Sequence, residues 1–211
     1  MRKVYHTRSM MKISTHGINI CISYPFVALL CFSVIVSKNM ITVIAVLSAI
    51  MHEIGHIAVM KKFSSEVINV NVVLFELSIH DESRPISEYN KDLAVNCAGP
   101  VVNIILWVLF YILYKFTFWS TAYSVAMVNI SLGIFNLLPI ETTDGGQILK
   151  IILSKKISVT TADTIMTVLS FIFIIPISIA GFYVLINSQY NYTMLFAVLY
   201  FVTALVFGLK K

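Results

Sequence analysis

Long apolar stretches separated by short polar segments run along this chain. Crossing the hydrocarbon core of a bilayer takes about 20 apolar residues in a helix, and six stretches come near that length. Their expected bounds are 17–37, 40–60, 92–114, 119–138, 163–186 and 192–209. The pattern therefore predicts an all-α polytopic membrane protein with about six transmembrane helices.

Composition supports the same class. Hydrophobic residues make up 58% of the 211 residues and charged residues only 12%, whereas soluble domains carry about a quarter charged residues. We expect an integral membrane protein with one domain over residues 1–211, without a PDZ or nucleotide-sensing domain. The basic, polar opening is followed by an apolar run without a small-residue cleavage site, so we expect that run to be retained as the first span.

Lysine and arginine placement predicts the orientation. With the amino terminus inside, the inner segments hold 13 of these residues and the outer segments hold only Lys38 and Lys115. Basic residues concentrate on the cytoplasmic side of membrane proteins. We therefore expect both termini in the cytoplasm. The basic residues sit between apolar segments rather than on one surface, so the net charge of +5 predicts no nucleic-acid partner.

The polar connection between the second and third spans is too long for a tight turn. Apolar residues alternate from Ile68 to Leu74 and then slip by one position to Phe75, Leu77 and Ile79. A period of two with a slip predicts a short β-like segment, either two strands or one bulged strand. An amphipathic loop at the membrane interface is the alternative.

The second stretch carries the candidate chemistry. Its only ionisable residues are His52, Glu53 and His56, and ionisable groups inside a spanning helix are costly and usually functional. His52 and His56 are one helical turn apart, so both imidazoles can bind one metal ion. Zinc lowers the pKa of water toward about 7, and Glu53 is placed to take the proton of such a water.

Two simpler readings stand beside this one. H-E-x-x-H also arises by chance in soluble helices, although chance explains it poorly in an apolar helix with no other charge. Gly55 disfavours a helix by about 1 kcal/mol relative to alanine. A small residue there permits close approach of a backbone or a substrate, or it serves ordinary helix packing.

The depth of the motif in the membrane follows from its distance to the next basic residue. His52 lies nine residues before Lys61, which is about 14 Å from the inner boundary at 1.5 Å per residue.

Catalytic zinc keeps three protein ligands, so a further acid is needed. The candidates near an inner boundary are Glu141, Asp144 and Asp163. Asp144 has the most suitable context, because Pro139 ends a helix shortly before it and two glycines follow it. A helix cap or a turn is an equally ordinary role for an aspartate in that context.

These motifs together resemble the site-2 protease family of intramembrane metalloproteases, and most of all its compact bacterial members that process a membrane-tethered sporulation sigma factor. The resemblance covers roughly residues 40–150, and its motifs are His52–His56, Ala98–Asn103, Asn136–Pro139 and Asp144–Gly145.

The resemblance implies roles for individual residues. His52, His56 and Asp144 would bind one catalytic Zn²⁺, and Glu53 would be the catalytic base. Asn103 and Asn136 would be polar groups near the substrate or its oxyanion; interhelical hydrogen bonds are the alternative role for both.

The implied function is intramembrane zinc-dependent endoproteolysis of a membrane-tethered protein, such as a pro-sigma or anti-sigma factor, with regulatory membrane proteins as further partners. The resemblance to bacterial members also implies a bacterial cytoplasmic membrane. Ile140–Thr143 is more polar than the family pattern. Two other functions stay open. A cytosolic-site membrane metalloprotease would need a downstream glutamate ligand. A transporter or proton relay using the His/Glu cluster would need neither metal nor Asp144.

Overall fold

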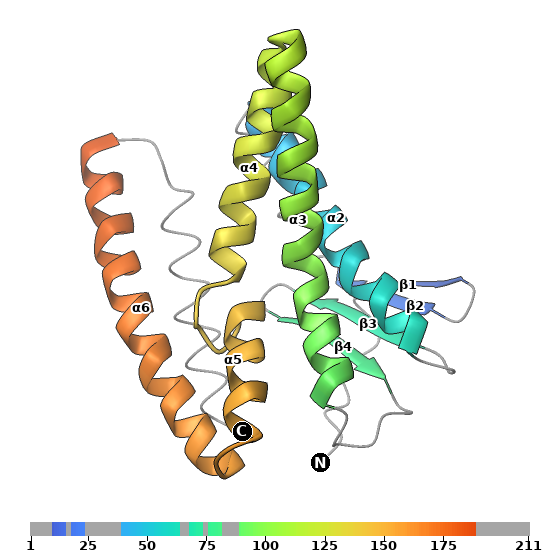
Figure 1. Cartoon of the computed structure of the whole chain (residues 1–211), viewed down its shortest axis with the longest axis vertical. Coiled ribbons are helices and arrows are strands. Elements are labelled where there is room, and N and C mark those ends of the chain that lie inside the picture. Colours follow the sequence, from blue (N-terminus) through green and yellow to red (C-terminus); the bar gives the residue numbers. More distant parts are fainter. Residues whose placement is uncertain are drawn as a thin grey trace.

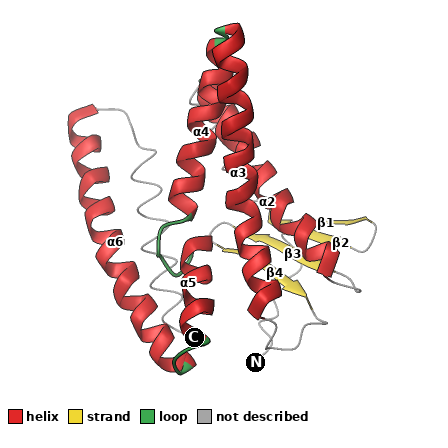
Figure 2. Ribbon diagram, viewed as in Figure 1, coloured by secondary structure: helices red, strands yellow, loops and turns green. Residues whose placement is uncertain are grey.

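The computed structural model describes residues 10–15, 18–23, 39–63, 68–73, 76–81 and 89–188. Helices dominate, and a small sheet lies beside the end of the bundle where α2 finishes and α3 starts (Figures 1 and 2). The elements in chain order are β1 (Met10–Thr15), β2 (Ile18–Ser23), α2 (Met40–Phe63), β3 (Ile68–Val73), β4 (Glu76–Asp81), α3 (Tyr89–Thr117), α4 (Ser120–Asn136), α5 (Asp144–Ser154) and α6 (Val159–Ser188).

Three helices in the described part of the chain are long and apolar enough to cross a membrane: α2, α3 and, from Val159 to Ala180, α6. They coincide with the second, third and fifth predicted spans. Their outward-facing side chains include many large exposed hydrophobic residues, which is the surface expected of a protein in contact with lipid. The chain is therefore an integral membrane protein. The helix at the fourth predicted span, α4, has 17 residues, and the predicted span 192–209 lies outside the described residues.

The three central helices pack through faces of small and polar residues. The buried face of α2 repeats about every four residues and consists of Ile44, Ser48, His52, Gly55, His56 and Met60. On α4 the buried face consists of Ala122, Ala126, Asn129 and Gly133. Small residues at one helix face let neighbouring backbones come close. Packing of α3 against both partners therefore fixes its position relative to the α2 face that carries the two histidines.

The strands form one sheet in the order β1-β2-β3-β4. β3 and β4 pair antiparallel where the sequence predicts its β-like segment, and β2 pairs parallel with β3. The sequence predicted a β-like segment only between the second and third spans, so β1 and β2 were not expected. The predicted first span, 17–37, also began too early, because Ile18–Ser23 is strand. The run alternates as I-N-I-C-I-S, and its apolar residues were read as the start of the longer apolar stretch; the rest of that span lies outside the described residues.

A short helix and a tight loop follow α4. The polar segment after residue 141, predicted as a connection, contains the 11-residue helix α5. Ile140 in the preceding loop is fully buried and packs with Ile174 of α6, surrounded by Phe135, Leu138, Phe173 and Ile177. This cluster anchors the loop between α4 and α6, so the first residue of α5 has a defined position.

Candidate metal centre

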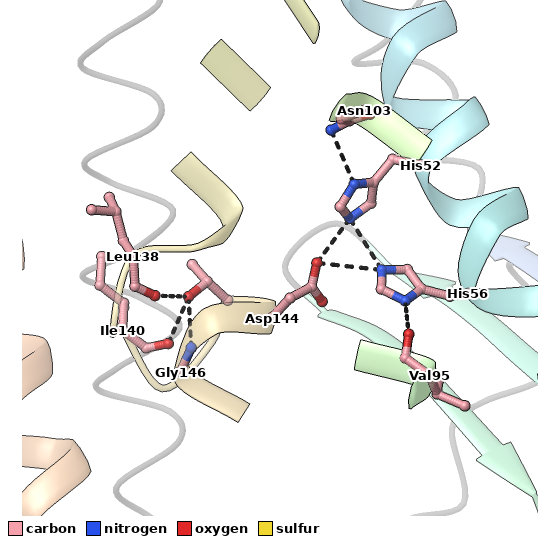
Figure 3. A network of polar contacts seen from close by, with 9 residues as sticks. His52, His56, Val95, Asn103, Leu138, Ile140, Asp144 and Gly146 are labelled. Carbon is pink, nitrogen blue, oxygen red and sulfur yellow. Dashed lines mark hydrogen bonds and ion pairs between the residues drawn. The ribbon is translucent and has the colours of Figure 1, made fainter. Parts of the chain in front are cut away.

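Three side chains from two separate parts of the chain point toward one another inside the bundle (Figure 3). His52 Nε2 lies 3.1 Å from His56 Nε2 and 3.0 Å from Asp144 Oδ2. His56 Nε2 lies 3.4 Å from the same carboxylate oxygen. Both histidines are buried and the aspartate is largely so. The structure thus brings together the three residues that the sequence proposed as metal ligands, although 88 positions separate His56 from Asp144 in the chain.

The three atoms have the spacing of a metal-binding face. A tetrahedral zinc site with bonds of about 2.0–2.1 Å sets neighbouring ligand atoms roughly 3.3 Å apart, close to the three separations observed. Two imidazole nitrogens and one carboxylate oxygen are also a donor set that zinc prefers. His52, His56 and Asp144 therefore fit a metal ion, and they form a group that could hold one.

Gly99 of α3 leaves the space that this site needs. A Cβ atom at this position would contact His56 Nε2, and it would lie only 2.5 Å from His52 Nε2. Those are the two nitrogens that face the carboxylate of Asp144. No side chain, not even that of alanine, fits at position 99 while the imidazoles keep this arrangement.

Gly55 makes the matching close approach from α2. A Cβ atom there would lie 3.0 Å from the carbonyl oxygen of Ala98 and 2.8 Å from the Val102 side chain. The small residue inside the motif therefore serves packing of α3 on α2. Through the same contact, the Val95 carbonyl of α3 comes within 2.8 Å of His56 Nδ1. This hydrogen bond places the proton on Nδ1 and leaves the Nε2 lone pair for a metal.

His52 has a partner on α3 as well. The amide nitrogen Nδ2 of Asn103 lies 3.1 Å from His52 Nδ1, and the asparagine side chain is completely buried. The resemblance implied that Asn103 lies near the substrate or oxyanion. In the structure its amide contacts the back of a ligand imidazole, on the side away from Asp144, and this is an interhelical hydrogen bond of the kind named as the alternative.

Glu53 follows His52 on α2 and is half-buried. Its Oε2 atom is buried and has no hydrogen-bond partner among the described residues. The carboxylate also lies within electrostatic reach of His56, His52 and Asp144. An acidic group within electrostatic reach of the candidate ligands, with a buried oxygen that has no partner among the described residues, is the type of group that general-base catalysis uses.

Thr143 positions the third ligand. It is the N-cap of α5: its hydroxyl accepts from the Gly146 N–H at 3.3 Å and can donate to the carbonyl of Leu138 at 2.6 Å or of Ile140 at 2.9 Å. The cap satisfies a free backbone donor of the helix and ties the helix to the loop before it. Asp144 is the next residue, so its carboxylate projects from the first turn of a fixed helix (Figure 3).

The glycines after Asp144 serve close packing. A Cβ atom at Gly145 would collide with the backbone of Leu137, and one at Gly146 would collide with the Ile140 carbonyl. Glycine pairs often mark turns in a sequence, but both of these glycines lie inside the first turn of α5. They are needed because the loop backbone folds directly against that turn.

The two other acids considered as ligands lie elsewhere. The Lys150 ammonium is 2.7 Å from Asp163 Oδ1 and 3.6 Å from Glu141 Oε1. Burial disfavours the charged form of Lys150, but the ion pairs with Asp163 and Glu141 outweigh it and raise the pKa of the ammonium. One lysine thus holds both acids at the α5–α6 contact, and Asp144 alone of the three faces the histidines.

Comparison with known proteins gives this arrangement a context. Residues 114–177 match peptidase family M50. A zinc metalloprotease of Methanocaldococcus jannaschii is 31% identical over 115 residues, which cover 52% of this chain and 33% of the relative. The solved site-2 protease from Methanocaldococcus jannaschii has the same fold, with a TM-score of 0.65, 20% identity and coverage of 93% of both chains.

This chain is thus similar to peptidase family M50 over residues 114–177, and its fold is that of the solved site-2 protease. The M50 match runs from the end of α3 into α6, so it includes Asp144 but neither histidine. The chain spans about a third of the length of the curated relative that it matches.

Several residues that build this site were missed or interpreted differently from the sequence. Val95 contributes a backbone carbonyl, which leaves no trace in side-chain chemistry. Gly99 and Thr143 stood within the motifs, but the reasons for them lie in contacts with distant parts of the chain. Asn136, predicted near the substrate, is the last residue of α4, and its side chain makes no hydrogen bond to the three ligands in the described part of the chain.

Proposed function

We propose that this chain is an intramembrane zinc metalloendopeptidase that hydrolyses peptide bonds of membrane-tethered proteins. The observation that carries the proposal is the convergence of His52, His56 and Asp144 within 4.8 Å of one another, on a face of a helix apolar enough to span a membrane. The M50 match, and the names of the metalloprotease and site-2 protease relatives, support zinc as the metal and a protein as the substrate.

In this proposal His52, His56 and Asp144 hold one Zn²⁺ ion. Zinc bound there supplies Lewis acidity, which lowers the pKa of water toward about 7 and polarises a peptide carbonyl. The Glu53 carboxylate takes the proton of the attacking water. It then passes that proton to the amine nitrogen as the C–N bond breaks. Burial of the ligands among α2, α3 and α5 keeps bulk water from competing with the substrate for the site.

We also propose six spans, with both termini on the cytoplasmic side of a bacterial membrane. The sheet supports this topology, because β2 and β3 pair side by side and a sheet lies outside the hydrocarbon core. The segment before α2 and the segment after it are then on one side of the membrane. Because α2 crosses the membrane once, that placement favours the first predicted span, most of which lies outside the described residues. The single domain over residues 1–211 is part of the same proposal.

The biological setting is proposed on narrower grounds. Processing of a pro-sigma or anti-sigma factor, a role in sporulation and control by regulatory membrane proteins rest on the resemblance of the motifs. A transporter or proton relay is the competing function. It would leave Asp144 dispensable and would not require a metal. The Asp144 carboxylate lies 3.0 Å from His52 Nε2, and this position favours the metal site.

The test couples metal content to cleavage. Purified wild type, Glu53→Gln and Asp144→Asn proteins are assayed for bound zinc and for cleavage of membrane-tethered candidates in proteoliposomes. Glu53→Gln should keep stoichiometric zinc and lose cleavage by at least about 100-fold, the usual contribution of a general base. Asp144→Asn should lose both, because the amide is a much poorer zinc ligand than the carboxylate.

Glu141→Gln is the matched control. It neutralises an acid three residues from Asp144 that contacts Lys150 and none of the ligands, so zinc and cleavage should stay near wild type. Substantial cleavage by Glu53→Gln would overturn the proposed mechanism. A wild-type protein without zinc, or an Asp144→Asn protein with full zinc and activity, would favour the transporter or relay.

A further inference from the structure

The two ligand imidazoles are oriented by groups on the same helix, α3, but these groups differ in kind. His56 Nδ1 donates to the Val95 carbonyl, which can only accept. His52 Nδ1 faces the side-chain amide of Asn103, which has a donor at one end and an acceptor at the other. The tautomer of His56 is therefore set by the backbone, while that of His52 depends on the direction in which the amide points.

With Asn103 Nδ2 toward His52, as in this structure, the imidazole accepts at Nδ1 and carries its proton on Nε2. That proton then lies between His52 Nε2 and Asp144 Oδ2, which are 3.0 Å apart. This is a good geometry for a hydrogen bond. A metal needs the opposite tautomer, with a lone pair on Nε2 and the proton on Nδ1. The Nδ1–H would then face an N–H₂ group, which is a donor against a donor.

A half-turn of the amide about its last bond removes this conflict. It exchanges Nδ2 and Oδ1 with almost no change in shape and presents an oxygen to the Nδ1–H of His52. Asn103 Oδ1 is at present buried without a hydrogen-bond partner among the described residues. Either orientation leaves one end of the amide unpartnered there, so neither is favoured by the asparagine itself. The proton position on His52 decides between them.

We propose that Asn103 is a positioning residue for the metal site, whose amide oxygen holds His52 in the Nδ1–H tautomer that metal binding needs. The proposal rests on the proposed zinc site and adds a residue to its function. It assigns Asn103 to the imidazole rather than to the substrate. Partners that fix a metal-bound histidine in this way typically contribute 10–100-fold to metal affinity.

The chain offers a matched control at Asn129. This asparagine lies on the neighbouring helix α4 and is also fully buried. Its Nδ2 donates to the hydroxyl of Ser48 at 3.0 Å, and its Oδ1 is likewise without a partner among the described residues. Ser48 is one turn before His52 on α2. Substitution of Asn129 therefore disturbs an equally buried amide between helices without touching a ligand.

The experiment measures zinc dissociation constants by chelator competition for the purified full chain in detergent, with thermal unfolding as the check on folding. N103L should weaken zinc binding by about 10–100-fold. N103D should stay within a few-fold of wild type, because a carboxylate oxygen accepts from Nδ1–H as the flipped amide does. N129L should also stay near wild type.

Each alternative result has a distinct meaning. Unchanged zinc affinity in N103L, affinity in N103D as low as in N103L, or an equal loss in N129L would each overturn the positioning role and leave the proposed protease intact. If N103L does not fold, N103A and N129A replace the leucine pair with the same expectations. A wild type that binds no zinc would overturn the metal site itself, and this proposal with it.

Discussion

The site is assembled from two regions that hold their ligands by different means. At the α2–α3 contact, His52 and His56 project from the middle of a long helix, and a second helix packs against them through Gly55 and Gly99. At the start of α5, Asp144 projects from the first turn of an 11-residue helix. That turn is held by the Thr143 cap and by the loop folded against it.

The difference lies in how each ligand can be displaced. The histidines move only if two spanning helices separate, because their spacing is set by the helix itself. The aspartate can move if one cap or one loop contact is lost. We therefore expect substitutions at the α2–α3 contact to abolish the metal site, and substitutions around α5 to weaken it by degrees.

The largest effect is expected for Gly99→Ala. The added methyl group would occupy the space at the two imidazole nitrogens, so metal binding and the helix contact cannot both be kept. Zinc affinity should fall by at least about 100-fold, equivalent to about 2.8 kcal/mol, and cleavage should fall with it. Zinc content after dialysis against a weak chelator measures the loss.

Gly133→Ala is the control for that substitution. A Cβ at this position of α4 would meet only Asn103 Cβ at 3.5 Å, an ordinary contact, and alanine favours a helix. Its zinc content should match wild type. If both alanine variants behaved alike, the special role of the α2–α3 contact would be wrong.

An intermediate effect is expected for Thr143→Val. The change keeps the shape but removes the hydroxyl that caps α5 and ties it to Leu138. Loss of such a cap costs about 1 kcal/mol of stability. If the same free energy is needed to hold Asp144 in its ligand position, zinc binds about fivefold more weakly. Thermal unfolding and chelator competition test the two parts separately.

Thr143→Ser keeps the hydroxyl and should restore both quantities to near wild type. A serine variant as weak as the valine variant would mean that the methyl group, rather than the cap, holds the loop in place.

The smallest effect is expected for Lys150→Met, which removes both ion pairs at the α5–α6 contact. Partly exposed ion pairs contribute about 0–1 kcal/mol, and none of these atoms belongs to the metal site, so zinc affinity should change by less than about twofold. The pKa of Lys150 is raised in the folded protein. The stabilisation is therefore complete below the unfolded pKa of about 10.4 and is lost as pH rises through the folded value.

Unfolding midpoints of wild type and Lys150→Met, compared between about pH 7 and pH 11, check this sign. The difference should be constant near neutral pH and should shrink at the alkaline end. A difference that grew with pH would contradict the ion-pair explanation.

The α2–α3 half of the site was the more predictable of the two. One-turn spacing of His52 and His56 in an apolar helix depends only on helix geometry, so the pair could be identified without knowledge of the fold. For the acid, the local sequence left Glu141, Asp144 and Asp163 open. The choice among them depends on Lys150, which holds the other two acids at the α5–α6 contact, and that contact is tertiary.

The fold shows the same division. Helices α2 and α3 follow from runs of apolar residues long enough to span a membrane. Strand β2 was hidden because Ile18–Ser23 continues into an apolar stretch, and pairing with β3 is a contact between segments about fifty positions apart. Helix α5 was missed because its length is below that of a span and its first turn is rich in glycine, which favours loops in local patterns.

The hydrogen bond from His56 to the Val95 carbonyl has a consequence for the inheritance of this site. Every amino acid at position 95 supplies the same carbonyl, so no single substitution there can delete the acceptor. The orienting group of His52 belongs to a side chain and is open to mutation. A saturation scan scored by metal retention should therefore tolerate many residues of suitable size at position 95, yet accept few at position 103. The two imidazoles have similar geometry, but the positions that orient them would then differ in how many substitutions they tolerate.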